Sequence, residues 1–249
     1  MGKADLHIHT CYSFDGTSTV SAVLEQAAHH TDLNVIAITD HDENEGALRA
    51  VEMAPAYGIE VIPGVEVSTA EGHLLALFVY RPILRGLSLV ETILKVAQQG
   101  GICVVPHPMA RGENGIKAPV IARALHNSEV ARTLVGLEVY NAGLFYWTSN
   151  QTASQLAFSL RLSRIGSSDS HMLWTIGAAS TYFRGTTAHD LRKALLEHST
   201  GVTGEQQPQP LRYFASWGKS QVLRKLGWVI SVRYPTSPFF LKRLNRTSN

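Results

Sequence analysis

The sequence predicts an α/β fold in which parallel strands form a barrel. Short apolar runs rich in valine and isoleucine alternate along the chain with stretches of helical pattern. Such continuous apolar runs are typical of strands buried on both faces, as in a parallel sheet. The 249 residues are 45% hydrophobic and 17% charged, a composition that supports one large globular domain with a substantial core.

The first expected strand carries the motif DLHIHT near the N-terminus, and seven apolar runs follow it. Six stretches with helical spacing lie between these runs, so that strands and helices alternate as β/α units. The expected strands cover residues 34–39, 59–67, 73–80, 102–105, 136–140, 164–166 and 178–183. The expected helices cover residues 20–30, 43–57, 87–99, 118–128, 149–160 and 188–198.

Capping residues and helix breakers support these helix bounds. Thr17, Ser18 and Thr19 precede the first helix, and their side chains can cap it. Gly100 follows the third helix, where a glycine commonly ends a helix. Pro55 lies within the second expected helix, so this helix should end or kink near Met53.

The last fifth of the chain differs from the rest in charge. Residues 201–249 hold eight Lys and Arg but only one acidic residue, Glu205, whereas the whole chain has 22 basic and 20 acidic residues. We therefore expect a barrel over residues 1–202 and a basic extension over residues 203–249. The extension should pack on the barrel or be tethered to it. Residues 201–210 should form a linker or a surface loop. The excess of basic residues in the extension is consistent with an anionic partner, such as nucleic acid, membrane lipid or another chain. It is equally consistent with a solvated surface segment.

Two further features concern the cellular compartment. Cys11 and Cys103 are too few for a disulfide framework and are typical of a reducing compartment. The N-terminus has no apolar stretch of signal-peptide length, and no later run approaches the length of a membrane span. The sequence therefore predicts a cytoplasmic protein without a membrane span, and it gives no indication of the oligomeric state.

Histidines and acidic residues gather where the expected strands begin or end. Because His7 and His9 lie two apart on a strand, both imidazoles point to one face and can reach one ion. The carboxyl ends of parallel barrel strands meet at one face, and about ten ligand-capable groups buried there would be costly without cations. The pattern therefore predicts a multinuclear metal site, although a single histidine is more often a core or surface residue than a ligand. The residues concerned are Asp5, His7, His9, Asp40, His41, Asp42, Glu66, His73, His107, Glu138, Asn141, Asp169 and His171.

Five ordered motifs resemble those of the PHP superfamily, named for polymerase and histidinol phosphatase. They are DLHIHT with SFDG, ITDHD, PGVEVS, PHP and SSDSH, and the resemblance runs from Asp5 to about Val202. It implies a distorted seven-stranded (β/α)7 barrel, similar to a TIM barrel. It also implies that the protein holds two or three divalent metal ions and hydrolyses phosphate esters.

The resemblance further implies a set of metal ligands, grouped into sites that share one carboxylate. The first ion would be held by His7, His9, Glu66 and Asp169, the second by Glu66, His73 and His107, and the third by Asp15, His41 and His171. Some members of the superfamily have a histidine in place of Asp15, so this residue bears on the identity and occupancy of the third ion. Mixed imidazole and carboxylate ligands suit Zn, Mn or Fe without choosing among them. Residues expected to orient the ligands through hydrogen bonds are Asp5, Asp40, Asp42 and Glu138.

The expected chemistry is attack on phosphorus by a metal-bound hydroxide, because a metal lowers the pKa of bound water from about 16 to around 7. His171 or Asp15 would help to protonate the leaving oxygen. Arg111 and Asn141 are candidates to hold the phosphate, although Arg111 fits an exposed loop charge equally well. We therefore expect a phosphoesterase that acts on a phosphomonoester, either a nucleotide or another small phosphate.

Three other functions are weighed against this expectation. A nuclease that trims short oligonucleotides is the nearest, and the basic extension slightly favours a nucleotide or nucleic-acid substrate. A non-catalytic binding protein would keep the barrel and lose the metals, but here every motif keeps at least one ligand. An amidohydrolase would usually need a strand-end lysine as the bridging ligand, and Glu66 occupies that kind of position instead.

Overall fold

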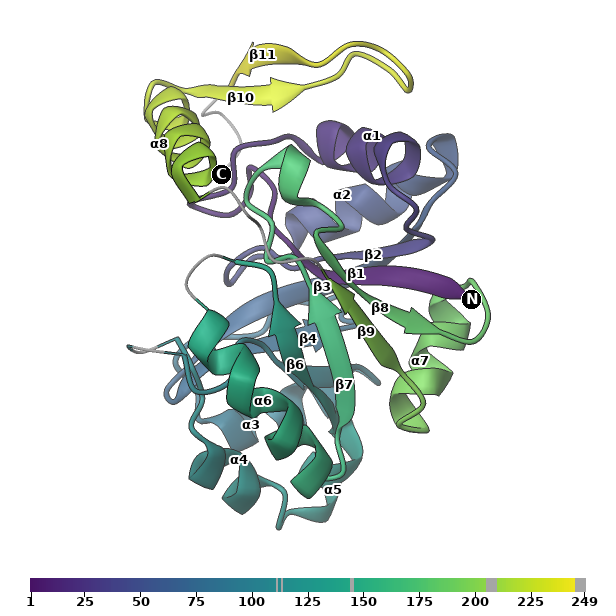
Figure 1. Cartoon of the computed structure of the whole chain (residues 1–249), viewed down its shortest axis with the longest axis vertical. Helices are drawn as coiled ribbons and strands as arrows, with labels where there is room; N and C mark the ends of the chain where they lie inside the picture. Colours follow the sequence, from purple (N-terminus) through teal and green to yellow (C-terminus); the bar gives the residue numbers. More distant parts are fainter. Residues whose placement is uncertain (111, 113, 144–145, 205–209, 245–249) are drawn as a thin grey trace.

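The computed structural model of the protein consists of a curved sheet covered by helices, with a small C-terminal lobe at one end (Figure 1). The structure describes residues 1–110, 112, 114–143, 146–204 and 210–244. The strands of the large sheet are β1 (Gly2–Ile8), β2 (Val35–Ile38), β3 (Glu60–Thr69), β4 (Gly72–Leu77), β5 (Ile102–Val105), β6 (Leu134–Asn141), β7 (Ser163–Ser167), β8 (Ala179–Phe183) and β9 (Gly201–Gly204). The helices around it are α1 (Val20–His30), α2 (Glu45–Met53), α3 (Leu89–Ala97), α4 (Ala118–Ala124), α5 (Ser128–Thr133), α6 (Trp147–Ser159) and α7 (Ala188–Leu196), with short 3-10 turns η1 (Ala54–Ala56) and η2 (Leu173–Thr175).

The large sheet curves into a nearly closed barrel. In the described part of the chain its nine strands follow the spatial order β7-β6-β5-β4-β3-β2-β1-β8-β9. The two ends of this order approach each other, because the amide of Gly166 on β7 donates to Thr181 Oγ1 on β8 at 3.1 Å. Ile8 at the end of β1 also forms a parallel bridge with Ser170, just after β7. The predicted α/β barrel is thus confirmed, with nine described strands in its sheet in place of seven.

The expectation that all strands are parallel is wrong. β4 runs antiparallel to β3 and β5, β8 runs antiparallel to β1, and β9 runs antiparallel to β8. Only residues 70–71 separate β3 from β4, and a connection this short can join only antiparallel strands. The carboxyl end of β3 and the amino end of β4 therefore lie at the same edge of the sheet. This arrangement explains how His73, at the beginning of its strand, comes beside Glu66.

Local capping explains most of the helix bounds. α1 begins where predicted, and Thr19 Oγ1 accepts a hydrogen bond from the amide of Ala22 at 3.3 Å. α2 ends at Met53 and continues as a 3-10 turn that contains Pro55, as its sequence predicted. The single helix expected over residues 118–128 is instead two helices, α4 and α5. The reason is that Asn127 Oδ1 accepts from two amides and caps a new helix.

The core fixes the strands that carry the strand-end histidines and acids. One cluster of buried apolar side chains draws on every strand from β1 to β8 and on α7. Two further clusters pack α1 and α2, and α3 to α6, against the sheet. Each fully buried leucine or isoleucine contributes roughly 1.5–3 kcal/mol to stability. Side chains at the strand ends therefore project from a rigid frame.

The C-terminal extension packs on the barrel instead of hanging from it. It consists of α8 (Pro210–Lys225) and the antiparallel pair β10 (Trp228–Ser231) and β11 (Phe240–Arg243), which lie beside α1 in Figure 1. The amide of Thr19 donates to the carbonyl of Ile230 at 2.8 Å, and the amide of Ile230 donates to Thr17 at 3.0 Å. The first part of the expected linker forms β9 and pairs with β8. Among the described helices, none combines the length and apolar character needed to cross a bilayer.

Candidate metal centre

Four ligand-capable atoms form a compact cluster where β1, β3 and β7 meet. His7 Nε2 lies 3.1 Å from Glu66 Oε2 and 3.4 Å from Asp169 Oδ1. His9 Nε2 lies 3.3 Å and 3.4 Å from the same two oxygens. Two ligands that are each about 2.1 Å from one ion, at a tetrahedral angle, stand about 3.4 Å apart. The spacing within this cluster therefore fits the ligands of a single ion.

The hydrogen bonding of the imidazoles supports the same interpretation. His7 Nε2, both ring nitrogens of His9, and His107 Nδ1 are buried without a hydrogen-bond partner in the described part of the chain. His7 Nε2 and His9 Nε2 are within ion-pair distance of carboxylates but lack the alignment of a hydrogen bond. A buried polar atom without a partner is costly. A divalent cation would use these lone pairs and would remove that cost.

Glu66 connects this cluster to a second group. Its Oε2 faces His7, His9 and His41, the last through a 3.1 Å contact with Nδ1. Its Oε1 faces His73 Nδ1 at 2.8 Å and His107 Nε2 at 3.1 Å. Because each oxygen faces a different set of imidazoles, the carboxylate is placed to bridge two ions.

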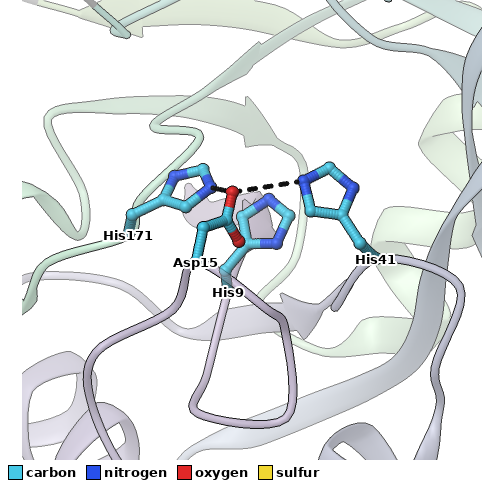
Figure 2. Close-up of side chains that lie close together, drawn as sticks. All are labelled: His9, Asp15, His41 and His171. Atoms are coloured by element: carbon cyan, nitrogen blue, oxygen red, sulfur yellow. Dashed lines mark hydrogen bonds and ion pairs between the residues drawn. The ribbon is translucent and has the colours of Figure 1, made fainter. Parts of the chain in front are cut away.

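A third group, drawn in Figure 2, consists of His9 and the partly exposed side chains of Asp15, His41 and His171. Asp15 Oδ2 lies 3.0 Å from His171 Nε2 and 3.5 Å from His41 Nε2. The ring of His9 stacks on that of His171, with ring centroids 4.1 Å apart. Asp15 comes from the loop between β1 and α1, and His171 from the segment after β7.

The structure brings together all of the side chains predicted as metal ligands. Their ligand atoms fall into four overlapping groups, within each of which all atoms lie no more than 4.8 Å apart. The groups are His9, Asp15, His41 and His171; His7, His9 and Glu66; His7, His107 and Asp169; and His41, Glu66 and His73. This donor set suits divalent ions with mixed nitrogen and oxygen ligation. The number and identity of the ions stay predictions.

Glu138 and Asn141 lie behind the ligands. Glu138 Oε1 lies 2.9 Å from His7 Nδ1, and Oε2 accepts from the amide of His107 at 2.8 Å. Asn141 Nδ2 donates to Glu138 at 2.9 Å and to Asp169 at 3.2 Å. Glu138 thereby fixes the ring of His7, as expected of a carboxylate that orients ligands. The amide of Asn141 is engaged with two carboxylates, and its contact with phosphate stays a prediction; Arg111 lies outside the described residues.

The other residues expected to orient the ligands are Asp5, Asp40 and Asp42. Within the part of the chain that the structure describes, they accept hydrogen bonds from backbone amides and not from imidazoles. Asp40 accepts hydrogen bonds from the amides of Thr10 at 2.6 Å and Ser13 at 3.2 Å, at the base of the Asp15 loop. Asp5 accepts from the amides after β7 and before β8, and Asp42 accepts from Ser68 on β3. Burial raises the pKa of both Asp5 and Asp40 to about 6, against the opposing effect of these hydrogen bonds. Each aspartate thus fixes a segment that carries or adjoins ligands.

The backbone at the site is strained. Asp42, His107 and Asp169 have φ values of 54°, 29° and 52°. These values lie in the left-handed region, which residues other than glycine rarely adopt. Such conformations cost about 1–3 kcal/mol each and are common at functional sites. The β1–β2 and β6–β7 registers also shift beside the site, at Asp5–Ile8 and Glu138–Tyr140. Strained turns and bulges of this kind aim side chains that a regular strand would place elsewhere.

Burial and neighbouring charges shift the pKa values of the residues in this cluster. Burial alone would raise the pKa of Asp169, but His7, His9 and His171 hold it far below its usual range. Burial lowers the pKa of His171, yet its hydrogen bond to Asp15 and the nearby carboxylates raise it to about 9. Burial and the charge of His171 lower the pKa of His9 to about 4. His9 is therefore neutral near pH 7, the form in which an imidazole binds metal.

A cavity of about 600 Å³ opens over the ligands. Its volume is within the usual range for small-molecule sites. Sequence reasoning missed Arg85, an exposed cation at its wall, and Tyr146, whose ring stacks on His107 at 4.5 Å. Both lie in connections between elements, where no strand end or motif marks them. Sequence reasoning also assigned no role to four other lining residues, Tyr12, Phe14, Ser68 and Asn114, although Phe14 and Ser68 lie within the motifs SFDG and PGVEVS.

The fold and the site together define an α/β barrel protein with a candidate multinuclear metal centre. Residues 5–142 match the PHP domain family, and residues 147–200 match the PHP-associated family. The chain belongs to the PHP domain family, as its motifs implied. The two matches cover most of the barrel and leave its last strand, β9, and the C-terminal extension outside them.

Several characterised and uncharacterised proteins are similar in sequence. An uncharacterized protein of Methanocaldococcus jannaschii is 35% identical over 149 residues, which cover 56% of this chain and 82% of the relative. A phosphoribosyl 1,2-cyclic phosphate 1,2-diphosphodiesterase of Eggerthella lenta is 42% identical over 64 residues, or 26% of this chain and 24% of that enzyme.

Solved structures share the fold at low identity. PsfC from Pseudomonas syringae superposes with a TM-score of 0.62 at 19% identity, covering 91% of this chain and 100% of PsfC. A protein of Bifidobacterium adolescentis, provisionally assigned as a metal-dependent phosphoesterase, has a TM-score of 0.59 at 18% identity, covering 82% of this chain and 97% of that one. An amidohydrolase of Chromobacterium violaceum with bound sulfate has a TM-score of 0.57 at 18% identity, covering 80% of this chain and 97% of that one.

Proposed function

We propose that this protein is a metal-dependent phosphoesterase that hydrolyses a phosphomonoester, either a nucleotide or another small phosphate. One observation carries the proposal: the two carboxylate oxygens of Glu66 face different sets of imidazoles. This arrangement supports a pair of neighbouring ions. Paired ions of this kind suit phosphate esters, because they can bind phosphate oxygens and neutralise charge that develops during the reaction. Membership of the PHP domain family supports the same class of reaction.

The ions would be held by the side chains of the four overlapping ligand groups. When bound, they supply hydroxide at neutral pH by lowering the pKa of water to around 7. Arg85 lines the cavity, and its guanidinium group can bind a phosphate oxygen there. When no ion is bound to them, Asp15 Oδ2 and His171 Nε2, which lie 3.0 Å apart and line the same cavity, can share a proton and pass it to the leaving oxygen.

The donor set favours ester hydrolysis over the chemistry of an amidohydrolase. Glu66, the residue that we propose to bridge the ions, is a carboxylate, and among the described residues that line the main cavity there is no lysine. Arg85 also lines this cavity, and the planar arrangement of its N–H donors matches phosphate oxygens. The amidohydrolase alternative therefore gains no support from the site itself.

The test combines metal content with phosphate release. Purified protein is assayed by elemental analysis and with nucleoside monophosphates, sugar phosphates, histidinol phosphate and short oligonucleotides. His9→Ala and Asp169→Ala should lose bound metal and about 100-fold or more in phosphate release, because ions supply several kcal/mol of stabilisation. His126→Ala, an exposed histidine after α4, is the matched control and should keep both.

The outcomes separate the alternatives. Unchanged metal content and activity in both variants would remove the assigned ligands. Full metal loading without phosphate release from any monoester would overturn the monoesterase proposal. Cleavage of oligonucleotides alone would favour the nuclease, and absence of both metal and activity would favour a binding protein.

A further inference from the structure

A side pocket of about 180 Å³ adjoins the metal centre. One side of this pocket is formed by Asp15, Asp169 and His171, which also line the main cavity. Three more of its lining residues, Tyr213, Phe214 and Trp217, belong to α8, a helix that lies outside both family matches. A ligand whose phosphate lies at the ions can therefore extend the rest of its structure toward α8.

The described wall of this pocket is aromatic. Apart from the three ligand residues and Gly143, it consists of Tyr146, Tyr213, Phe214 and Trp217. Trp217 is 41% exposed and Phe214 is 47% exposed, large values for aromatic rings beside a buried polar centre. Aromatic side chains that stay accessible at a concave site are typical of binding surfaces.

The aromatic wall is held rigidly against the site. Arg224 on α8 donates to the carbonyls of Cys11 and Phe14, each at 3.0 Å. Gln221 Nε2 donates to the carbonyl of Asp15 at 2.6 Å. The rings of Tyr213 and Trp174 also meet edge to face, with centroids 6.1 Å apart. The same helix thus anchors the loop that carries Asp15 and places aromatic rings beside it.

We propose that this pocket binds the base of a nucleoside monophosphate, so that the substrate of the metal centre is a nucleotide. This inference rests on the proposed phosphoesterase function and names its substrate class. A planar, uncharged ring matches the pocket, because the described side chains beyond the ligands offer aromatic faces and no charge. Stacking of a base on an aromatic side chain contributes about 1–3 kcal/mol.

The size of the pocket favours a single nucleotide. A volume of about 180 Å³ equals that of roughly six water molecules, which suits one ring system and not a stack of bases. A simple sugar phosphate would leave the aromatic wall in contact with water. We therefore expect the enzyme to prefer a nucleoside monophosphate both to a sugar phosphate and to an oligonucleotide.

The first test compares AMP with ribose 5-phosphate, since both present the same primary phosphate ester. The wild-type protein should favour AMP in kcat/KM. Trp217→Ala should lower this preference about 5- to 150-fold, the ratio that corresponds to the loss of one stacked base, mainly through the KM for AMP. Val222→Ala removes an exposed apolar side chain of the same helix outside the pocket, and it should keep the preference.

The second test needs no turnover. Calorimetry of the metal-loaded protein should detect binding of adenosine, which has no phosphate, and Trp217→Ala should weaken it while Trp217→Phe retains most of it. Failure of adenosine to bind the wild type, or an equal kcat/KM for the two esters, would overturn the nucleotide pocket and leave the phosphoesterase intact. If no ester is hydrolysed, the proposed function fails, and adenosine binding alone still decides whether the pocket accepts a base.

Discussion

Glu66 illustrates how much of this site depends on one side chain. In the described structure its two oxygens lie within 3.3 Å of ring nitrogens of five histidines. Burial would raise the pKa of its carboxyl group, but the surrounding imidazoles hold that pKa well below its usual range. The residue is therefore ionised, as a bridging ligand must be.

The substitution Glu66→Gln should remove at least one ion per chain. The amide keeps the size of the side chain but brings no negative charge to offset the ions, and its NH2 group cannot act as a ligand. Elemental analysis of the purified variant measures the loss. Glu60→Gln, at the opposite end of β3, is the control, since the carboxylate of Glu60 accepts from the amide of Ala188. Equal metal content in the two variants would contradict the bridging role.

His171 should couple metal binding to proton release. With a pKa of about 9, its ring carries a proton near pH 7.5 that a ligating imidazole must lose. Metal loading of the wild type at that pH should therefore release about one proton more than loading of His171→Gln. Calorimetry in two buffers of different ionisation enthalpy counts the protons. An identical count would show that His171 binds no ion, and the difference should vanish above about pH 9.

At the residue scale the sequence was informative because ligands are chemically distinctive. Histidines and acids that follow apolar runs, such as His41 and Asp169, could be assigned to one site before any geometry was known. Arg85 and Tyr146 could not, since neither follows a strand and both residue types are common on surfaces. Their place in the cavity depends on loop paths that no local pattern encodes.

At the level of elements, α8 stabilises the loop that carries Asp15. The guanidinium of Arg224 donates to three carbonyls of this loop, those of Cys11, Ser13 and Phe14. Each hydrogen bond from a charged donor contributes about 1.5–3 kcal/mol when buried, and less where solvent reaches it. The loop therefore owes much of its order to a helix more than 200 residues away in sequence.

Replacement of Arg224 by methionine should loosen this loop while the barrel stays folded. We expect faster hydrogen exchange in the segment from Cys11 to Gly16 and a lower occupancy of the ion at Asp15. Mass-spectrometric hydrogen exchange and elemental analysis measure the two effects. Lys225→Met, at the exposed neighbouring position of α8, serves as the control. Exchange that is equally slow in both variants would mean that the loop is fixed from the barrel side alone.

The elements themselves were largely predictable from their sequence patterns. Apolar runs and caps placed β5 and α1 at their observed bounds, because each pattern depends on neighbouring residues. The direction of β4 was not predicted, although the two-residue connection before it allows only an antiparallel partner. α8 was missed because its apolar residues show no clear helical period: several of them face the site and the solvent instead of a core.

At the scale of the whole molecule, the predicted metal ligands come from most parts of the barrel. They project from β1, β3 and β4, from the segments that follow β2, β5 and β7, and from the loop held by α8. The barrel could be predicted, since alternating strands and helices have few ways to bury their apolar faces. Its mixed strand directions and its closure through β8 and β9 depend on long-range pairing that local patterns do not specify.

Because ions that join so many strands bind the folded chain alone, their removal should destabilise the whole protein and not only the site. An ion present at about 100 times its Kd stabilises the folded state by about 2.7 kcal/mol. For a chain of this size we therefore expect a chelator to lower Tm by about 5–10 °C in a single cooperative transition. Differential scanning calorimetry with and without EDTA measures the shift. Glu66→Gln, which has already lost ions, should respond less. An unchanged Tm after verified removal of metal would mean that hydrogen bonds among the ligands hold the strand ends together without cations, and that the metal centre is an addition to the fold and not part of its stability.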